Sequence, residues 1–333
     1  MSGGIDLIPV WGPLIISVTI TDEKGDESDK LTVELDNRDG QCVYPGEGQI
    51  ITASGGYIGE GATRGGQFEI DQVDFEGWPE KISINGTTVS ASKQTKEKKT
   101  EAHKKEDTKT VGDLAKKIAG RNGWSPKVAS KIASIPLEYE GQTSEFDTQF
   151  LNRVIRRFGG ELSVKEGNLV ISMAGESMSV SGLAMPTIIV AKGHNLLGYT
   201  ASFKKRVDHG KAQAHTFDRK DVKRIDVDAG LGDITYRLRE PFQTKEEAKA
   251  ASEAKVTDLK RGTGSATFEI EGDPNAAAGC SASVSGCPSK VNGIWNVTRA
   301  EHQWQGGAYK VSLACETPAS ESGSSEGGSG SGS

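Results

Sequence analysis

The sequence predicts a mainly β protein with an α+β unit in its middle, and three observations carry this prediction. Short apolar runs that alternate with polar residues fill the first ninety positions and return after Pro186, and this period of two is typical of half-buried strands. Glycine is abundant, with 42 residues in 333, and much of it lies between these runs, where turns are needed. Between the two β regions, apolar residues recur at helical spacing.

The N-terminal region contains the first predicted strands. Leu31, Val33 and Leu35 alternate with polar residues, and the segment is flanked by an acidic turn at 22–29 and by the turn sequence at 36–40. Further strands are predicted at 14–20, 49–53, 66–73 and 81–91. Strands of this length and spacing indicate a small barrel or sandwich, so we expect residues 1–95 to form one β domain.

The composition changes at Lys93. The stretch 93–131 carries twelve Lys/Arg and five Asp/Glu, and its first part, 93–109, has almost no apolar residue. We therefore expect an exposed connection or a surface strand there. A helix is predicted to begin at Thr110, because Thr110 and Asp113 form a capping pair and Val111, Leu114 and Ile118 form one apolar face. Gly120 is the predicted stop of this helix.

Two more helices and a hairpin follow in the sequence. Ser125-Pro126 predicts the start of a short helix, with Pro at the first helical position. Ser144 and Asp147 predict the capping pair of a third helix, which Gly159-Gly160 ends. The stripe on this helix is interpreted as core and not as a cofactor site: Phe146, Phe150, Val154 and Phe158. With a hairpin at 161–172, residues 96–185 are expected to form an α+β middle domain.

Residues 186–316 are expected to form a second β domain with one inserted helix. Thr244 and Glu247 cap the helix, which continues to Leu259. The predicted strands are 187–191, 199–203, 212–217, 234–238, 264–270, 294–301 and 309–315. The tail, 317–333, is mostly Ser, Gly and Glu, so it is expected to be disordered, and its end resembles an engineered linker.

Composition excludes several classes of protein. The net charge of −6, from 46 acidic and 40 basic residues, excludes a generally basic nucleic-acid coat. No run approaches the roughly 18 apolar residues that a membrane span needs, and residues 1–10 lack the features of a secretory signal. Four cysteines are too few for a disulfide scaffold. Whether Cys280 and Cys287 pair stays open, and we favour reduced thiols.

Several residue clusters are candidates for functional sites. The acidic residues Asp22, Glu23, Asp26, Glu27 and Asp29 lack the spacing of a calcium loop, so a solvated turn is the favoured interpretation. The five histidines show no zinc-binding spacing: His103, His194, His209, His215 and His302.

Motifs for other chemistry are also missing from the sequence. The glycine pairs Gly59/Gly61 and Gly262/Gly264 lack the context of a nucleotide-binding loop and are interpreted as turns. No two carboxylates stand out as a catalytic pair. The basic stretch 93–131 has only Trp124 as an aromatic residue, so a solvated surface or a salt-bridged subunit interface is favoured over a nucleic-acid site. We predict no catalytic, metal-binding or cofactor-binding residue, and the partner-interface residues stay unassigned.

Four segments, in this order, resemble the late-control gene D family of phage tail hub proteins. They are Glu27–Gly40, Thr110–Ala119, Gln142–Asp147 with Phe150–Arg153, and Gly293–His302 with Gly306–Tyr309. The resemblance covers nearly the whole chain to Glu316. The lysine-rich stretch after Lys93 and the Ser/Gly tail depart from the family pattern, so nothing is carried over there.

The resemblance implies two barrel-like tube domains with an α+β domain beside them, assembled as a ring-forming homotrimer. Such a ring would join the tail tube to the central spike in the virion baseplate, around an axial channel, after assembly in the host cytoplasm. The implied partners are the tube protein, the spike protein and other baseplate proteins, with the tape measure protein as a further candidate. No enzymatic activity, cofactor, membrane insertion or sequence-specific nucleic-acid binding is expected. The alternative is a tail-tip protein that binds or hydrolyses peptidoglycan, since Thr110–Trp124 resembles a lysin-motif-like helix.

Overall fold

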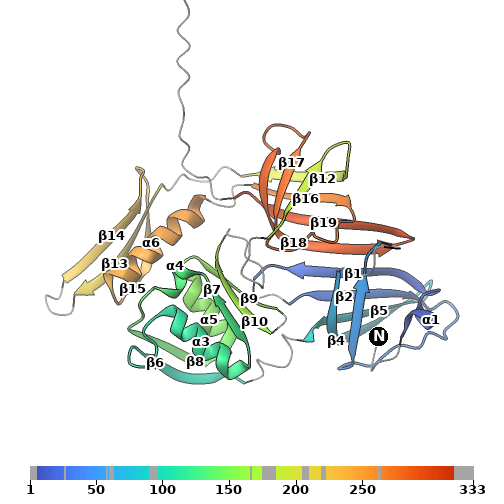
Figure 1. Cartoon of the computed structure of the whole chain (residues 1–333), viewed down its shortest axis with the longest axis horizontal. Helices are drawn as coiled ribbons and strands as arrows, with labels where there is room; N and C mark the ends of the chain where they lie inside the picture. The colour runs from blue at the N-terminus through green and yellow to red at the C-terminus, as the bar shows by residue number, and fades with distance from the viewer. Residues whose placement is uncertain are drawn as a thin grey trace, which may run out of the picture.

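The structure, a computed structural model, describes residues 6–25, 28–57, 59, 64–89, 97–165, 167–174, 185–204, 210–218, 223–260 and 264–318. Two β units lie at one side of the molecule, and the α+β unit and a second helix-covered sheet lie at the other (Figure 1). The mainly β fold that the sequence predicts is confirmed. The tail beyond Pro318 lies outside the described residues, so its predicted disorder stays a prediction.

A single sheet joins the N-terminal and C-terminal β regions. Among the described residues it contains eleven strands, and its main path runs β12-β16-β19-β18-β1-β2-β5-β4-β3. The joint is the antiparallel pair β1 (Ile15–Glu23) and β18 (Gly293–Gln305), with Ile20 opposite His302. Because backbone hydrogen bonds continue across this joint, the two β units share one continuous sheet.

The N-terminal unit contains the short helix α1 and five strands around one core. Their bounds are α1 Ile8–Trp11, β1, β2 Lys30–Asp36, β3 Ile50–Gly55, β4 Arg64–Glu76 and β5 Lys81–Thr88. Trp11, Leu35, Phe68 and Ile84 are among the buried residues. Strand β3 ends the hydrogen-bonded path, yet a Cβ at Gly55 would lie 2.5 Å from the Trp304 ring of β18. The sheet therefore curls until its last strand packs on β18, as in a barrel-like unit.

The C-terminal unit has its own core beneath the other half of the sheet. Its strands are β11 Thr187–Ala191, β12 Leu196–Phe203, β16 Gly264–Glu271, β17 Ser281–Ser285, β18 and β19 Ala308–Glu316. Phe268 and Trp295 meet at its centre, with ring centroids 5.7 Å apart. The turn between β11 and β12 is tied by Asn195, whose Nδ2 donates to the Ile189 carbonyl at 2.7 Å. The strand β17 was not predicted from the sequence.

The middle region packs helices on two small sheets, as expected for an α+β unit. It contains β6 Lys99–Lys104 paired with β8 Tyr139–Glu145, and β7 Ser125–Val128, β10 Asn168–Met173 and β9 Gly160–Lys165 in a second sheet. The helices are α3 Val111–Asn122, α4 Ser130–Ala133 and α5 Asp147–Arg156. Of the predicted stripe, Phe150, Val154 and Phe158 are buried in the core, and Phe146 is half-buried.

Three local predictions in this unit are wrong. Helix α3 runs through Gly120 and ends before Gly123, which has a left-handed φ of 73°. Ser125-Pro126 begins the edge strand β7 and not a helix, since a sheet edge tolerates a residue without an N–H. Ser144 does not cap α5, because the residue before the helix is Phe146 and no side chain caps it.

A further sheet and the predicted inserted helix also pack on the middle unit. The sheet contains β14 Lys223–Gly230, β13 Lys211–Asp218 and β15 Thr235–Phe242, and α6 (Lys245–Lys260) lies against it (Figure 1). The predicted cap is present, with Glu247 N donating to Thr244 Oγ1 at 3.1 Å. Ala248 and Ala251 of α6 belong to the hydrophobic core of the α+β unit. The predicted boundaries of the three domains, 1–95, 96–185 and 186–316, stay a prediction.

Candidate functional site

The acidic residues that were weighed as a calcium loop serve the backbone instead. Asp22 is buried, and its Oδ2 accepts a hydrogen bond from Ala278 N at 3.1 Å. Asp29 accepts from Glu23 N at 3.2 Å. Asp26 and Glu27 lie outside the described residues. Within the described part of the chain, no group of three or more His, Cys, Asp or Glu residues is placed to hold a metal ion.

The described histidines are dispersed over the fold. His103 is buried and stacks on Phe150, with ring centroids 5.0 Å apart. His302 is buried between Tyr309 and the Ala276 carbonyl, at 2.8 Å and 3.0 Å from its two ring nitrogens. His215 is buried in β13 and His194 is exposed, while His209 lies outside the described residues.

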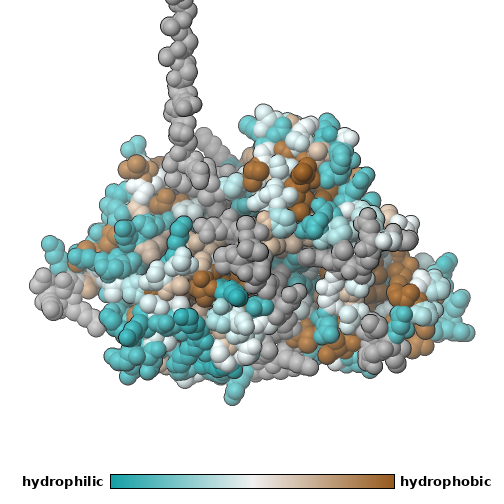
Figure 2. Space-filling view, viewed as in Figure 1, coloured by the Kyte–Doolittle hydropathy of each residue, from teal (hydrophilic) through white to brown (hydrophobic). Residues whose placement is uncertain are grey.

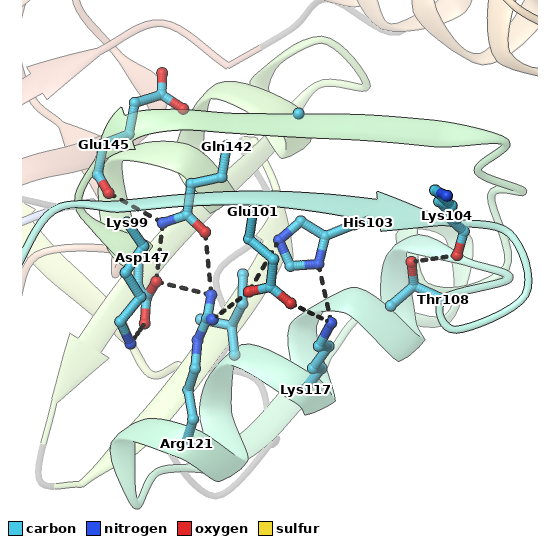
Figure 3. Close-up of polar contacts among 12 residues, drawn as sticks. Lys99, Glu101, His103, Lys104, Thr108, Lys117, Arg121, Gln142, Glu145 and Asp147 are labelled. Carbon is cyan, nitrogen blue, oxygen red and sulfur yellow. Dashed lines mark hydrogen bonds and ion pairs between the residues drawn. The ribbon is translucent and has the colours of Figure 1, made fainter.

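A buried polar cluster in the middle unit was not predicted, and Figure 3 shows it. Asp147, 3% exposed, stands at the start of α5. Its carboxylate accepts from Asn122 Nδ2 at 2.8 Å and Gln142 Nε2 at 2.9 Å, and it pairs with Arg121 at 2.8 Å and Lys99 at 3.3 Å. These partners come from β6, α3 and β8, so one carboxylate ties three elements to α5.

A second carboxylate extends the cluster along α3. Glu101 on β6 pairs with Lys117 and Arg121, both at 2.7 Å. The hydrogen bond from Lys117 and the bond from Arg121 outweigh desolvation and lower the pKa of Glu101. Burial raises the pKa of Asp147, but the hydrogen bonds from Gln142 and Asn122 and the Arg121 charge outweigh burial, and the net pKa is lowered.

Burial lowers the pKa of His103, which sits beside this cluster. The imidazole is therefore neutral at pH 7 and both carboxylates are charged. Every carboxylate of the cluster is used in an internal ion pair. The arrangement fixes β6, α3 and α5 against each other, which is a structural role.

Four of the twelve basic residues of the stretch 93–131 form ion pairs within the described part of the chain. Lys99, Lys117 and Arg121 belong to the cluster above, and Lys105 pairs with Glu138. Trp124, the aromatic residue of the stretch, is buried in the α+β core. Residues 93–96 of this stretch lie outside the described residues. These internal pairs weaken the interpretation of the stretch as a phosphate-binding surface.

The four cysteines are free thiols in the structure. Cys280 and Cys315 are buried in the core of the C-terminal unit, and Cys42 and Cys287 are half-buried. Burial raises the pKa of Cys315 to about 12, which makes this thiol a poor nucleophile. Cys280 and Cys287 are therefore not bridged in this fold.

An exposed surface at the far end of the N-terminal unit was also missed from the sequence. We call it the acidic tip: Val43, Phe75 and Trp78 with Asp39, Glu76 and Glu80. Trp78, in the turn between β4 and β5, is 89% exposed, and Val43 is 72% exposed. Trp11 Nε1 donates to the Val43 carbonyl at 2.8 Å, and Asn37 N donates to the Glu80 carbonyl at 3.0 Å. Contacts of this kind hold α1, the loop 37–44 and the β4–β5 turn together as one surface.

A second exposed apolar surface lies on the C-terminal unit. We call it the basic edge: Ile189, Leu197 and Ile294 with Lys192, His194 and Lys290. Ile189 and Ile294 both flank Ser283 in the register of β11, β17 and β18, so the three form one row across the sheet. Figure 2 shows apolar atoms near the labels of β12 and β17 in Figure 1, and others around the end that carries α1. Single-residue hydropathy does not distinguish such residues from core, which is why sequence reasoning left the interface residues unassigned.

No helix in the described part of the chain has the length and apolar character to cross a membrane.

Two known proteins that are similar to this chain are both named as probable baseplate hub proteins. It is 27% identical over 354 aligned positions to a probable baseplate hub protein of Escherichia phage P2, covering 92% of this chain and 89% of the relative. It is 26% identical to the probable baseplate hub protein of Escherichia phage 186, covering 95% and 91% of the two chains. No family model matches. The predicted resemblance to phage tail hub proteins is confirmed.

Solved structures share the fold at low identity. A 43 kDa tail protein of prophage MuSo2 from Shewanella oneidensis has a TM-score of 0.67 at 15% identity, with 91% of this chain and 94% of that chain covered. A tail protein from Neisseria meningitidis has a TM-score of 0.64 at 11% identity, with 91% and 92% covered. The fold that this chain shares with these two proteins therefore covers almost the whole chain.

Proposed function

We propose that this chain is the structural hub of a phage or phage-derived tail baseplate, which joins the tail tube to the central spike as a ring of three chains around an axial channel. The observation that carries the proposal is the likeness to two baseplate hub proteins over 92% and 95% of the chain. A likeness of that extent includes both β units and the α+β unit between them. The virion baseplate is then the place of action.

The architecture supports a ring-forming role in physical terms. The β1–β18 joint makes one continuous wall from two β units, so each chain contributes two neighbouring wall segments. Three such chains would present six segments, which would match a six-fold tube on one side and a three-fold spike on the other. The edges of the small barrels would then be covered by neighbouring chains, which suppresses unwanted strand pairing.

The role we propose is structural and not enzymatic. Both relatives are named as hub proteins, in agreement with this part of the expectation. The proposed partners are other baseplate proteins and, more specifically, the tube protein, the spike protein and the tape measure protein. No observation on the described surface favours the peptidoglycan alternative.

Reconstitution tests this function. The tagged chain is mixed with the spike protein and the tube protein of the same particle, and complexes are separated by size exclusion and imaged by negative stain. We expect one complex that contains the chain and the spike, and tube polymerisation that starts from this complex. A chain that binds neither protein, but clears or sediments with purified cell walls, would support the tail-tip alternative instead.

A further inference from the structure

Two exposed apolar surfaces of opposite charge stand apart on the same chain. The tip segments, 36–44 and 74–81, contain five acidic residues and two basic ones. The edge segments, 185–204 and 281–296, contain no acidic residue, three lysines and one histidine. Each surface combines exposed apolar side chains with one dominant sign of charge. Monomeric proteins seldom expose apolar patches of this kind without a partner.

The acidic tip has the composition of a protruding anchor. Trp78 is almost fully exposed in the β4–β5 turn. Phe75 is exposed at the end of β4 and packs edge-on against Tyr44, with ring centroids 5.3 Å apart. Glu76 and Glu80 flank Trp78. Large aromatic residues that enter a partner's pocket dominate binding energies at protein interfaces. The surrounding carboxylates select a partner surface that carries cations.

Charge argues against contact between two copies of the same surface. An isologous contact would place one acidic tip against another and would oppose carboxylates across the interface. The same holds for two basic edges. The tip therefore needs a different surface, and this chain itself presents one with the required chemistry.

The basic edge combines exposed apolar side chains with positive charge, which are the two properties that a partner of the acidic tip needs. Ile189, Ile294 and Leu197 are at least half exposed, at 67%, 50% and 51%. Lys192 lies beside the β17–β18 turn that contains Lys290, because Lys192 N donates to the Ser285 carbonyl at 3.1 Å. Both lysines and His194 are exposed.

Two carboxylates occur at the margin of the basic edge. Glu269 and Glu271 on β16 lie along this margin, and Glu271 pairs in register with Lys310 of β19. The exposed apolar residues of the basic edge, with Lys192, His194 and Lys290 beside them, are available to a partner.

We infer that the acidic tip of one copy docks on the basic edge of the next copy, in a head-to-tail contact. This inference rests on the proposed function, because a head-to-tail contact closes into a ring when its rotation permits, and three chains are the proposed ring. The occupant of each surface is thus a second copy of the chain. Trp78 is the anchor residue, and the lysines 192 and 290 meet the carboxylates of Glu76 and Glu80.

Two broken variants and their mixture test the inference. The tip variant combines Trp78→Ala with Glu76→Gln, and the edge variant combines Ile189→Ala with Lys192→Gln. A matched control, Leu231→Ala with Asp233→Lys, changes one exposed apolar and one exposed acidic residue in the β14–β15 turn. Light scattering measures the mass of each over a range of concentrations, and thermal unfolding verifies that all variants are folded.

We expect the wild type and the control to form a three-chain species, and each broken variant to associate about tenfold more weakly or worse. An equimolar mixture of the two broken variants should stop at a two-chain species. One intact tip and one intact edge remain in that mixture, and they make a single contact that cannot propagate. Only a head-to-tail contact between these two surfaces gives this pattern.

Fluorescence of Trp78 gives an independent readout. Trp11, Trp124 and Trp295 are buried and Trp304 is half-buried, whereas Trp78 is 89% exposed, so acrylamide quenching reports chiefly on Trp78. Assembly of the wild type should shield Trp78 from the quencher, and the edge variant should leave it accessible.

Two other outcomes would overturn the inference, and they differ in what else they reject. Wild-type trimers that neither variant weakens would reject this contact and leave the proposed hub in place. A wild type that stays a single chain at every concentration, with the spike protein also present, would reject both the contact and the ring.

Discussion

At the scale of single residues, Asp147 shows how one side chain organises the middle unit. Its buried carboxylate meets Gln142, Asn122, Arg121 and Lys99, which come from three other elements. A buried charge of this kind is tolerated only where ion pairs and hydrogen bonds replace water. The sequence suggested Asp147 as a helix cap, and the structure uses it as a cross-link.

Removal of this carboxylate should destabilise the protein. We expect Asp147→Ala to lower the free energy of unfolding by about 2–3 kcal/mol, because it removes the hydrogen bonds from Asn122 and Gln142 and the ion pair with Arg121 at a buried site. Urea unfolding followed by circular dichroism measures the change. Asp107→Ala, at an exposed position of the same unit, is the control and should cost less than about 0.5 kcal/mol. Equal costs for the two variants would contradict the cross-link.

The same residue predicts a pH dependence. The folded pKa of Asp147 is lowered, so its contribution is fully present above the unfolded pKa of about 3.9 and is lost as pH falls through the folded value. The difference in unfolding midpoint between wild type and Asp147→Asn should therefore be largest above pH about 5 and should shrink below pH about 4. A difference that is constant from pH 3 to pH 7 would show that folding does not shift the pKa of this carboxyl group.

At the scale of elements, two glycines near the C-terminal end of α3 have different roles. Gly120 lies inside the helix and faces open space, whereas Gly123 has a φ of 73° and terminates it. Gly120→Ala should stabilise the protein by about 0.5–1 kcal/mol, because alanine is the better helix former. Gly123→Ala should destabilise it by about 1 kcal/mol, because the left-handed conformation strains a Cβ. Thermal unfolding of the two variants distinguishes them, and shifts of the same sign would contradict the assigned helix end.

This pair also shows where sequence reasoning succeeds and where it stops. The strand pattern of Leu31, Val33 and Leu35 and the cap at Thr110 are local signals, and both are present in the fold. Whether Gly120 or Gly123 ends α3 depends on which carbonyls the next residues reach. The signal at Pro126 is ambiguous for a similar reason, because proline suits a helix start and an edge strand equally.

Non-local contacts were beyond the reach of sequence patterns. The pairing of β1 with β18 joins residues nearly three hundred positions apart, and no periodicity encodes it. The polar cluster also escaped prediction, since Lys99, Arg121 and Asp147 come together only after three elements have packed.

At the scale of the whole molecule, the contact between Gly55 and Trp304 closes the N-terminal unit onto the sheet. A Cβ at Gly55 would lie 2.5 Å from the Trp304 ring, whose neighbour Tyr309 stacks on it at 4.7 Å. We expect Gly55→Ala to cost about 1–3 kcal/mol, because the ring must shift within packed surroundings. Differential scanning calorimetry measures the loss. Gly46→Ala, at an exposed position with no atom within 4 Å of the added Cβ and no left-handed φ, is the control for the loss of glycine itself.

The central claim concerns the assembled ring, and the mass of the chain in solution tests it most directly. Light scattering of the purified 35.3 kDa chain, alone and with the central spike protein, counts the copies in the complex. The account predicts a species with three copies of the chain, alone or once the spike is added. A chain that remains a single copy in the presence of the spike would contradict the hub, because one copy cannot surround an axial channel.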